Sequence, residues 1–141
     1  MMSQENVEIV RASIATYNAD GLEASMSYLH PDVEWFTNPD APDMGAFKGH
    51  DGIRKLAAQL EEVLGEVRIQ PDRFVEAGEE VVVLGRLFVT GTESGAATES
   101  HRAWVYTLRD GKIIRLLTFT NQADALAVVA GASEQDAHAE S

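Results

Sequence analysis

The stretch SHRAWVYTLRDGKIIRLLTFT, residues 100–120, holds two apolar runs rich in β-branched and aromatic side chains on either side of Asp110-Gly111. Asp-Gly between two such runs is a strong signal for a β-hairpin with a two-residue turn. A turn of that length pairs Arg109 with Lys112, and this pairing determines which side chains of the two strands share a face. The sequence therefore predicts one strand over 98–108 and a second over 112–121.

The predicted register divides this part of the sheet into a mixed face and an apolar face. The mixed face carries, from the hairpin and the strand before it, Arg86, Phe88, His101, Ala103, Thr118 and Thr120, with Ala103 opposite Thr118. Polar groups among apolar ones suit a partly polar cavity beneath helices, so we expect a small-molecule pocket on this side. The apolar face carries Trp104, Tyr106, Leu117 and Phe119.

The apolar face must be buried away from water. Three short helices are too few to cover both sides of a sheet, so we expect this face to pack against a second copy of the chain in a two-fold homodimer. The alternative is that a helix of the same chain covers it.

Apolar residues recur at helical spacing in the first half of the chain and alternate in the second half. The spacing predicts helices over 4–18 and 53–64, and a short helix that ends before His30-Pro31. Further predicted elements are strands over 33–36, 67–76 and 80–90, a long loop over 38–49, and a closing helix over 123–130. Helices followed by an antiparallel meander indicate an α+β fold with helices on one face of a curved sheet. We expect a single domain over 1–130 and a disordered acidic tail over 131–141.

Composition narrows the classes of function. The 141 residues include 23 Asp and Glu against 11 Lys and Arg, for a formal net charge of -12. This balance makes nucleic acid and anionic membranes poor partners. Because cysteine is absent, thiol nucleophiles and thiolate zinc sites are excluded. The first residues carry no signal-peptide pattern and no stretch approaches a membrane span in length, so we expect a cytoplasmic protein.

Three motifs stand in a familiar order along the chain: HPDVEW at 30–35, GHDGI at 49–53 where a helix begins, and RDGKI at 109–113 in the last hairpin. Together they resemble the SnoaL-like polyketide-cyclase family of the nuclear transport factor 2-like superfamily, which also holds ketosteroid isomerases and limonene epoxide hydrolase. The resemblance covers residues 4–130. It implies a cone-shaped α+β fold in which a curved antiparallel or mixed sheet wraps around about three N-terminal helices, with a conical pocket and a dimer through the sheet.

The catalytic residues of these relatives find few matches in the chain. Where ketosteroid isomerases place their proton-shuttling Asp, the chain has Thr37, and their oxyanion-hole Tyr falls near Ser13. The strand that should carry their partner acid contains no Asp or Glu. Of the Asp, Arg, Asp set of limonene epoxide hydrolase only the Arg matches, as Arg86, and the two carboxylates fall at Phe88 and Thr118. The resemblance therefore disfavours both of these mechanisms.

Three residues are the predicted catalytic groups. His101 is the candidate proton shuttle, because histidine suits proton transfer near neutral pH; a hydrogen bond at a sheet edge is the alternative explanation. Arg86 is a mid-strand cation among apolar residues, so we expect it to meet either a carboxylate or an anionic or carbonyl-bearing substrate. Asp43 lies in the Pro-rich loop that would border the pocket, and it is the candidate general base.

The predicted pocket lining comes from several elements: Trp35, Thr37, His50, Phe88, Ala103, Thr118 and Thr120. His50 has a second interpretation as part of the first turn of the third helix. His30, Asp32 and Glu34 alternate on a strand, but no second His cluster would complete a metal shell. We therefore expect no metal and no cofactor.

Two functions remain open. The first is an isomerase, cyclase or hydratase that acts on a hydrophobic, carbonyl-bearing small molecule, with Arg86 polarising the oxygen and His101 moving a proton. The second is a non-catalytic ligand-binding or protein-interaction dimer that has lost the carboxylates of the family.

Overall fold

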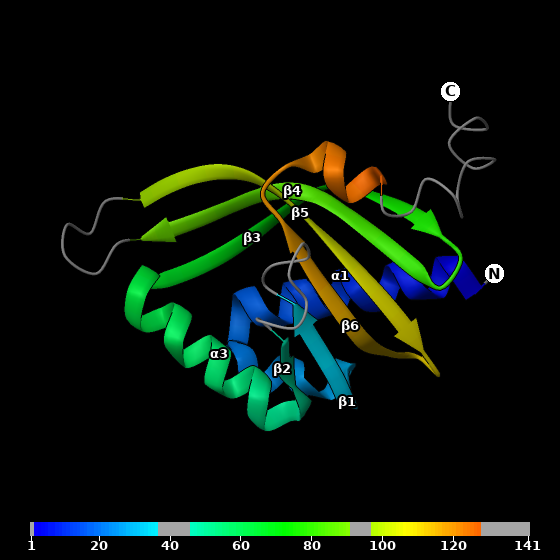
Figure 1. Cartoon of the computed structure of the whole chain (residues 1–141), viewed down its shortest axis with the longest axis horizontal. Coiled ribbons are helices and arrows are strands. Elements are labelled where there is room, and N and C mark those ends of the chain that lie inside the picture. Colours follow the sequence, from blue (N-terminus) through cyan, green and yellow to red (C-terminus); the bar gives the residue numbers. More distant parts are fainter. Residues whose placement is uncertain (1, 37–45, 91–96, 128–141) are drawn as a thin grey trace.

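The computed structural model describes residues 2–36, 46–90 and 97–127, in which helices lie on one side of a curved six-stranded sheet (Figure 1). The helical elements are α1 (Met2–Asp20), α2 (Leu22–Ser25), the 3-10 turn η1 (Met26–Tyr28) and α3 (Gly49–Leu64). The strands are β1 (Leu29–Phe36), β2 (Ala46–Lys48), β3 (Glu66–Ala77), β4 (Glu80–Thr90), β5 (Ala97–Arg109) and β6 (Lys112–Phe119). Residues 122–127 add a short helical segment, and the predicted tail over 131–141 lies outside the described residues. The α+β class is confirmed.

The sheet is mixed, with strand order β2-β1-β6-β5-β4-β3. Strands β3 to β6 form the predicted antiparallel meander, and β1 pairs in parallel with β6. The hairpin turn is also as predicted, because Asp110 and Gly111 have φ values of 54° and 77° and Arg109 pairs with Lys112. Two positive φ angles are what a type I′ turn requires.

Strand β1 begins earlier than expected. The short helix ends before His30-Pro31 as predicted, because α2 and η1 stop at Tyr28, but the strand predicted over 33–36 already begins at Leu29 and includes both residues. Strand β1 pairs with β6 at Leu29 and again from Glu34, with an irregularity between the two. Pro31 falls in that gap, where its missing N–H removes no hydrogen bond from the ladder.

A β-bulge in β6 changes the register of the last hairpin. Leu108 pairs with Ile113, but Thr107 pairs with Arg115, so Ile114 is an extra residue on β6. Because side chains alternate between the faces of a strand, one extra residue reverses the face of every side chain that follows it.

The predicted faces are therefore wrong for β6 beyond the bulge. Thr118 pairs with Trp104, and Ala103 pairs with Phe119 instead of Thr118. Thr118 thus shares a face with Trp104, whereas Leu117 and Phe119 join Ala103 on the other face.

The helices pack on the face that carries Trp104. The inner core unites α1, η1, α3 and the sheet through Val7, Val10, Ile14, Met26, Val33, Ile53, Val81, Val83, Trp104, Tyr106, Leu108 and Ile113. A second core on the outer face contains Val75, Ala77, Val82, Leu84, Ala103, Val105, Phe119 and Ala125. Ala125 belongs to the segment 122–127, which therefore packs on the outer face.

The predicted dimer contact is wrong in its composition. Trp104 and Tyr106 are only 3% and 5% exposed, and they pack against helices of the same chain. Leu117 and Phe119 lie on the opposite face. Helices of the same chain cover the face of Trp104 and Tyr106, as the alternative explanation holds. The homodimer itself stays a prediction.

Glycines end both long helices and place the residues that follow. Gly21 has φ 91° and donates its N–H to the Tyr17 carbonyl at 2.9 Å. Gly65 has φ 82° and bonds the Glu61 carbonyl at 2.8 Å, which ends α3 where the sequence predicts. A positive φ suits glycine at a helix C-terminus.

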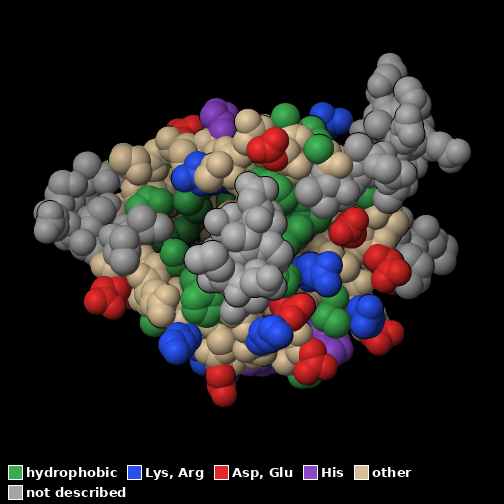
Figure 2. Space-filling model, in the orientation of Figure 1, with side chains coloured by type: hydrophobic (Ala, Val, Ile, Leu, Met, Phe, Trp, Pro, Cys, Tyr) green, Lys and Arg blue, Asp and Glu red, His purple; other side chains and the backbone are tan. Residues whose placement is uncertain are grey.

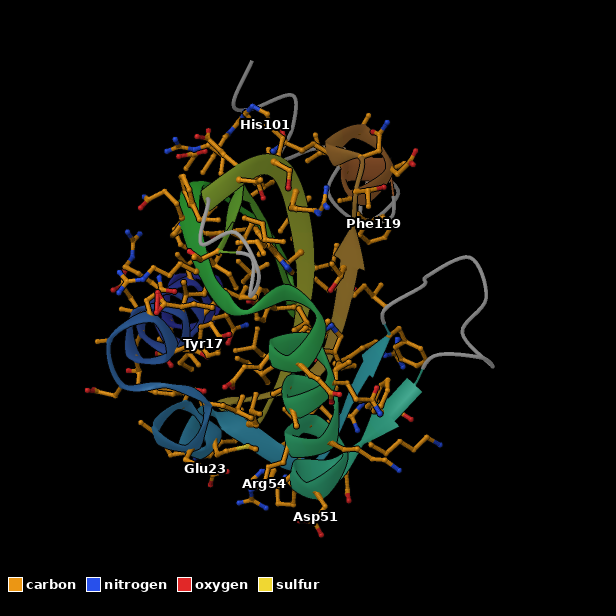
Figure 3. The ribbon with its side chains drawn as sticks, turned by 90° about the vertical axis from the view of Figure 1, so that its left-hand side faces the viewer. Tyr17, Glu23, Asp51, Arg54, His101 and Phe119 are labelled. Atoms are coloured by element: carbon orange, nitrogen blue, oxygen red, sulfur yellow. The ribbon has the colours of Figure 1, made fainter. Side chains whose placement is uncertain are left out.

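Arg54 of α3 joins that helix to α2. Its guanidinium donates two hydrogen bonds to Glu23, at 2.7 and 3.2 Å, and a third to Asp51 at 2.9 Å. The hydrogen bond from Arg54 lowers the pKa of Glu23. Figure 3 shows the three side chains together at one end of the molecule. This contact holds α2, and with it Leu22, against the rest of the helical layer.

Candidate functional site

An apolar cavity of about 80 Å³ lies between the helices and the inner face of the sheet. Most of its lining is aliphatic or aromatic: Ile14, Leu22, Leu29, Val33, Trp35, Ile53, Ile69, Trp104 and Leu116. The hydroxyl-bearing residues in the lining are Ser13, Tyr17, Ser25 and Tyr106. The inner cavity thus combines a hydrophobic wall with a small number of neutral polar groups, as small-molecule sites commonly do.

A wider opening of about 480 Å³ adjoins the inner cavity. We call it the mouth; its lining includes Asn18, Ala57, Leu60, Glu61, Glu66, Val67 and Arg68. Tyr17, Leu22 and Trp35 line both spaces, so they form the junction between mouth and inner cavity. Figure 2 shows a hollow in the surface with hydrophobic side chains around it. The mouth alone falls within the usual volume of small-molecule pockets, about 300 to 1,000 Å³.

Three hydrogen bonds hold the walls of the mouth in place. Trp35 Nε1 donates to Thr118 Oγ1 at 2.9 Å, which fixes the indole of β1 against β6. The Asn18 side chain bonds both backbone groups of Ile69, with Nδ2 donating to the carbonyl at 2.7 Å and Oδ1 accepting from the N–H at 3.1 Å. Asn18 therefore ties the end of α1 to β3 in the way a neighbouring strand would.

Tyr17 and Tyr106 are the titratable groups of the inner cavity. Burial, followed by the negative charges of Glu61 and Glu66, raises the pKa of Tyr17. Burial also raises the pKa of Tyr106, and the nearby Tyr17 adds to that effect. Both phenols consequently stay neutral across the physiological range, so each hydroxyl can donate a hydrogen bond.

These tyrosines should make the folded chain less stable at alkaline pH. Their pKa values in the folded state lie above the ordinary 10.0, so the unfolded chain loses these protons first as the pH rises. The stability that the protonated phenols contribute is fully present below the ordinary tyrosine pKa of 10.0. It is lost as the pH rises through the raised pKa values of the folded state. Urea unfolding between about pH 8 and about pH 11 should show a steeper loss for the wild type than for Tyr106→Phe. Equal slopes would contradict the assignment.

A protein-family model, that of the SnoaL-like domain, matches residues 10–116. The chain belongs to the SnoaL-like family. Comparison of this SnoaL-like chain with curated proteins gave no match.

Solved structures share the SnoaL-like fold. An NTF2-like protein of unknown function from Burkholderia pseudomallei has a TM-score of 0.73 and 25% identity, over 89% of this chain and 97% of that one. TerC, crystallised with polyporic acid, has a TM-score of 0.73 and 31% identity over the same shares of the two chains. A SnoaL-like polyketide cyclase from a Jannaschia species has a TM-score of 0.71 over 93% of both chains; its 21% identity shows the fold alone.

In this SnoaL-like chain Arg86 meets carboxylates on the outer face. Its guanidinium donates to both oxygens of Asp72, at 2.9 and 3.1 Å, and to Glu99 at 3.4 Å. Its central carbon also lies 5.5 Å from the ring centre of Phe88. The hydrogen bond from Arg86 lowers the pKa of Asp72. Of the two partners expected for Arg86, the structure supplies the carboxylate, and neither cavity includes Arg86 in its lining.

The other predicted catalytic residues are separate from the inner cavity or lie outside the described part. His101 is exposed, pairs with Arg86 across the two strands, and lies on the outer face. Figure 3 shows His101 and Phe119 at the end of the molecule opposite Arg54. The predicted base Asp43 lies outside the described residues, as does Thr37.

The predicted lining residues also divide between the faces. Trp35 lines both spaces and bonds Thr118, so the structure brings these two together at the junction. Phe88 lies beside Arg86, and Ala103 is buried in the outer core. Thr120 is exposed. His50 lies in the first turn of α3, and its Nε2 is 3.1 Å from the carbonyl oxygen of Leu29.

Tyr17 and Tyr106 are the site residues that sequence reasoning missed. Tyr17 follows Val7, Val10 and Ile14 at helical spacing on α1, a pattern that indicates the apolar face of a helix and gives no sign of a site residue. Tyr106 was assigned to a dimer face because the bulge at Ile114 was missed. The doublet Ile113-Ile114, followed by Arg115, interrupts the alternation of β6 and is the signal for that bulge.

Other classes of site find no support in the part of the chain that the structure describes. Within 2–36, 46–90 and 97–127, no three His, Asp or Glu side chains gather as metal ligands would. The helices of these same ranges include none that is long and apolar enough to cross a membrane.

Proposed function

We propose that the chain binds a hydrophobic small molecule that bears a carbonyl oxygen. The apolar body of the ligand would occupy the mouth, and its oxygen would enter the inner cavity and accept hydrogen bonds from Tyr17 and Tyr106. The observation that carries the proposal is the presence of two neutral phenols in one otherwise apolar lining. Arg86 and His101, on the outer face, take no part in it.

The two hydroxyls are available for a ligand. No hydrogen bond joins either phenol hydroxyl to another described residue, and no buried polar atom of these residues lacks a partner, so both hydroxyls are accessible from the cavity that they line. A ligand that covers such a hydroxyl without accepting its hydrogen bond leaves the donor unpaired, which costs free energy, so a ligand oxygen that accepts the bond gains affinity. The same donor would reject a ligand of equal shape that lacks the oxygen.

The family supports the binding of a small molecule. SnoaL-like and NTF2-like relatives share this fold over most of the chain, and TerC, 31% identical, was crystallised with polyporic acid. Membership of the SnoaL-like family supports a further candidate, an isomerase or cyclase in which the two phenols polarise a substrate carbonyl. That reaction also needs a proton-transferring base, and the described lining of the inner cavity contains no carboxylate, imidazole or amine. Ligand binding is therefore the function that the geometry supports best.

Binding can be followed through the tryptophans of the chain. Both of them, Trp35 and Trp104, line the inner cavity, so their fluorescence should change when a ligand enters. We expect decalin ketones, which absorb little where tryptophan does, to change the emission in a saturable manner. Tyr17→Phe and Tyr106→Phe should each weaken binding of the ketone by about tenfold, the value of one hydrogen bond.

Tyr28→Phe is the matched control, because Tyr28 is the third tyrosine of the chain and belongs to neither lining. It should leave the affinity unchanged, and the corresponding hydrocarbon should bind all four proteins alike. Absence of a saturable signal with any ketone would contradict the proposed function. Consumption of an enone by the wild type and not by Asp43→Asn would establish the catalytic candidate instead.

A further inference from the structure

The charged residues that line the mouth are Glu61, Glu66 and Arg68. Glu61 lies in the last turn of α3 and Glu66 opens β3, so the sharp connection at Gly65 brings both carboxylates to the same opening. Arg68 contacts Glu66 at 3.7 Å, and both side chains are more than half exposed. Glu61 has no ion pair within the described residues. The mouth therefore carries a net negative charge.

Both carboxylates act on the junction between the mouth and the inner cavity. Tyr17 lies at that junction, and Glu61 and Glu66 are the two charges that add to burial in raising the pKa of its phenol. An anionic phenol at this position is thus disfavoured by both residues. The same field must act on an anionic group that a ligand places beside Tyr17.

No cationic group in the described lining of the inner cavity pairs with a negative charge. The lining that the structure describes contains no Lys, Arg or His, and its polar groups are hydroxyls and indole nitrogens. Removing a carboxylate from water without a cationic partner is costly. The net charge of -12 on the whole chain acts in the same direction at longer range.

We propose that Glu61 and Glu66 make this pocket select against anionic ligands, so that it takes neutral hydrophobic ketones and rejects the carboxylate of the same skeleton. This inference rests on the proposed function, because it assigns the ligand class of the same site. It makes Glu61 and Glu66 specificity-determining residues that need not touch the ligand.

The test uses one decalin skeleton that carries an acetyl, a carboxylate or an aminomethyl group on the same ring carbon. The affinities of the three compounds are measured by calorimetry at low salt, with tryptophan fluorescence to report entry into the inner cavity. We expect the carboxylate to bind the wild type about tenfold more weakly than the ketone, and the ammonium compound to bind more tightly than the carboxylate. In Glu61→Gln/Glu66→Gln the difference between ketone and carboxylate should fall to about threefold or less.

Glu62→Gln is the matched control. Glu62 follows Glu61 on α3, is exposed and does not line the mouth, yet Glu62→Gln changes the net charge by the same amount as the single variant Glu61→Gln, which is measured beside it. This variant should keep the discrimination of the wild type. A wild type that binds ketone and carboxylate equally well would overturn the selection and leave the proposed function standing. A Glu62→Gln effect as large as that of Glu61→Gln would also overturn it, and binding of none of the three compounds would contradict the proposed function itself.

Discussion

Gly85→Ala should lower the free energy of unfolding by about 3 kcal/mol. A Cβ at this position would lie 2.3 Å from the carbonyl oxygen of Gln70 and 3.1 Å from Cα of Pro71. These are backbone atoms of β3, which bulges against β4 between Pro71 and Arg73, so no side-chain rotation can relieve the overlap. The variant can form only if β3 moves away from β4. Urea unfolding followed by far-UV circular dichroism measures the loss.

Gly78→Asn separates the overlap from the general effect of replacing a glycine. Gly78 has φ 65° in the turn between β3 and β4, and a Cβ there would meet nothing within 4 Å. Asparagine adopts positive φ more easily than other residues with a side chain, so we expect a cost below about 1 kcal/mol. A Gly85→Ala protein as stable as Gly78→Asn would show that the two strands are not in such close contact.

Trp104→Ala should cost about 4 kcal/mol of stability, the usual size of the loss when a buried tryptophan is truncated. Trp104 is 3% exposed and packs into the core that joins the helices to the sheet. Because the contacts are made within one chain, the loss should not depend on protein concentration. Thermal unfolding over a hundredfold range of concentration provides the measurement.

The concentration dependence also discriminates between the two possible covers of this face. If Trp104 packed against a second copy of the chain, the difference in melting temperature between variant and wild type would grow with concentration. Trp35→Phe is the comparison within the same cavity, since Trp35 is only partly buried and phenylalanine keeps most of its volume. We expect it to cost less than half as much as Trp104→Ala.

Much of the fold follows from local patterns. The apolar spacing of Val7, Val10 and Ile14 predicts the helix that buries them, and Asp110-Gly111 predicts the turn that forms. These signals suffice because they are local: each depends on the conformational preference of a short segment. Pairing of β1 with β6 joins residues far apart in the chain, and no local pattern reports it.

The candidate site was predicted less well because its location depends on which side chains of β6 face the helices. A single extra residue at Ile114 exchanges the faces of Thr118 and Phe119, and with them the expected positions of pocket and interface. Trp35 was placed in the lining independently of that register, and the structure puts it at the junction. Arg86 and His101 were placed on one face together, and they do share a face, but it is the outer one.

The parallel pairing of β1 with β6 bears on how the chain acquires its shape. Leu29 meets Ile113, so β1 and β2 join the rest of the sheet only after most of the polypeptide has been made and the final hairpin has formed. Contacts between such distant segments require a large loop to close, which slows folding. The wall of the inner cavity that contains Trp35 and Leu116 is assembled in that late step. A ligand of the kind proposed above should therefore bind only after this pairing has formed, and it should then slow unfolding by holding β1 and β6 together.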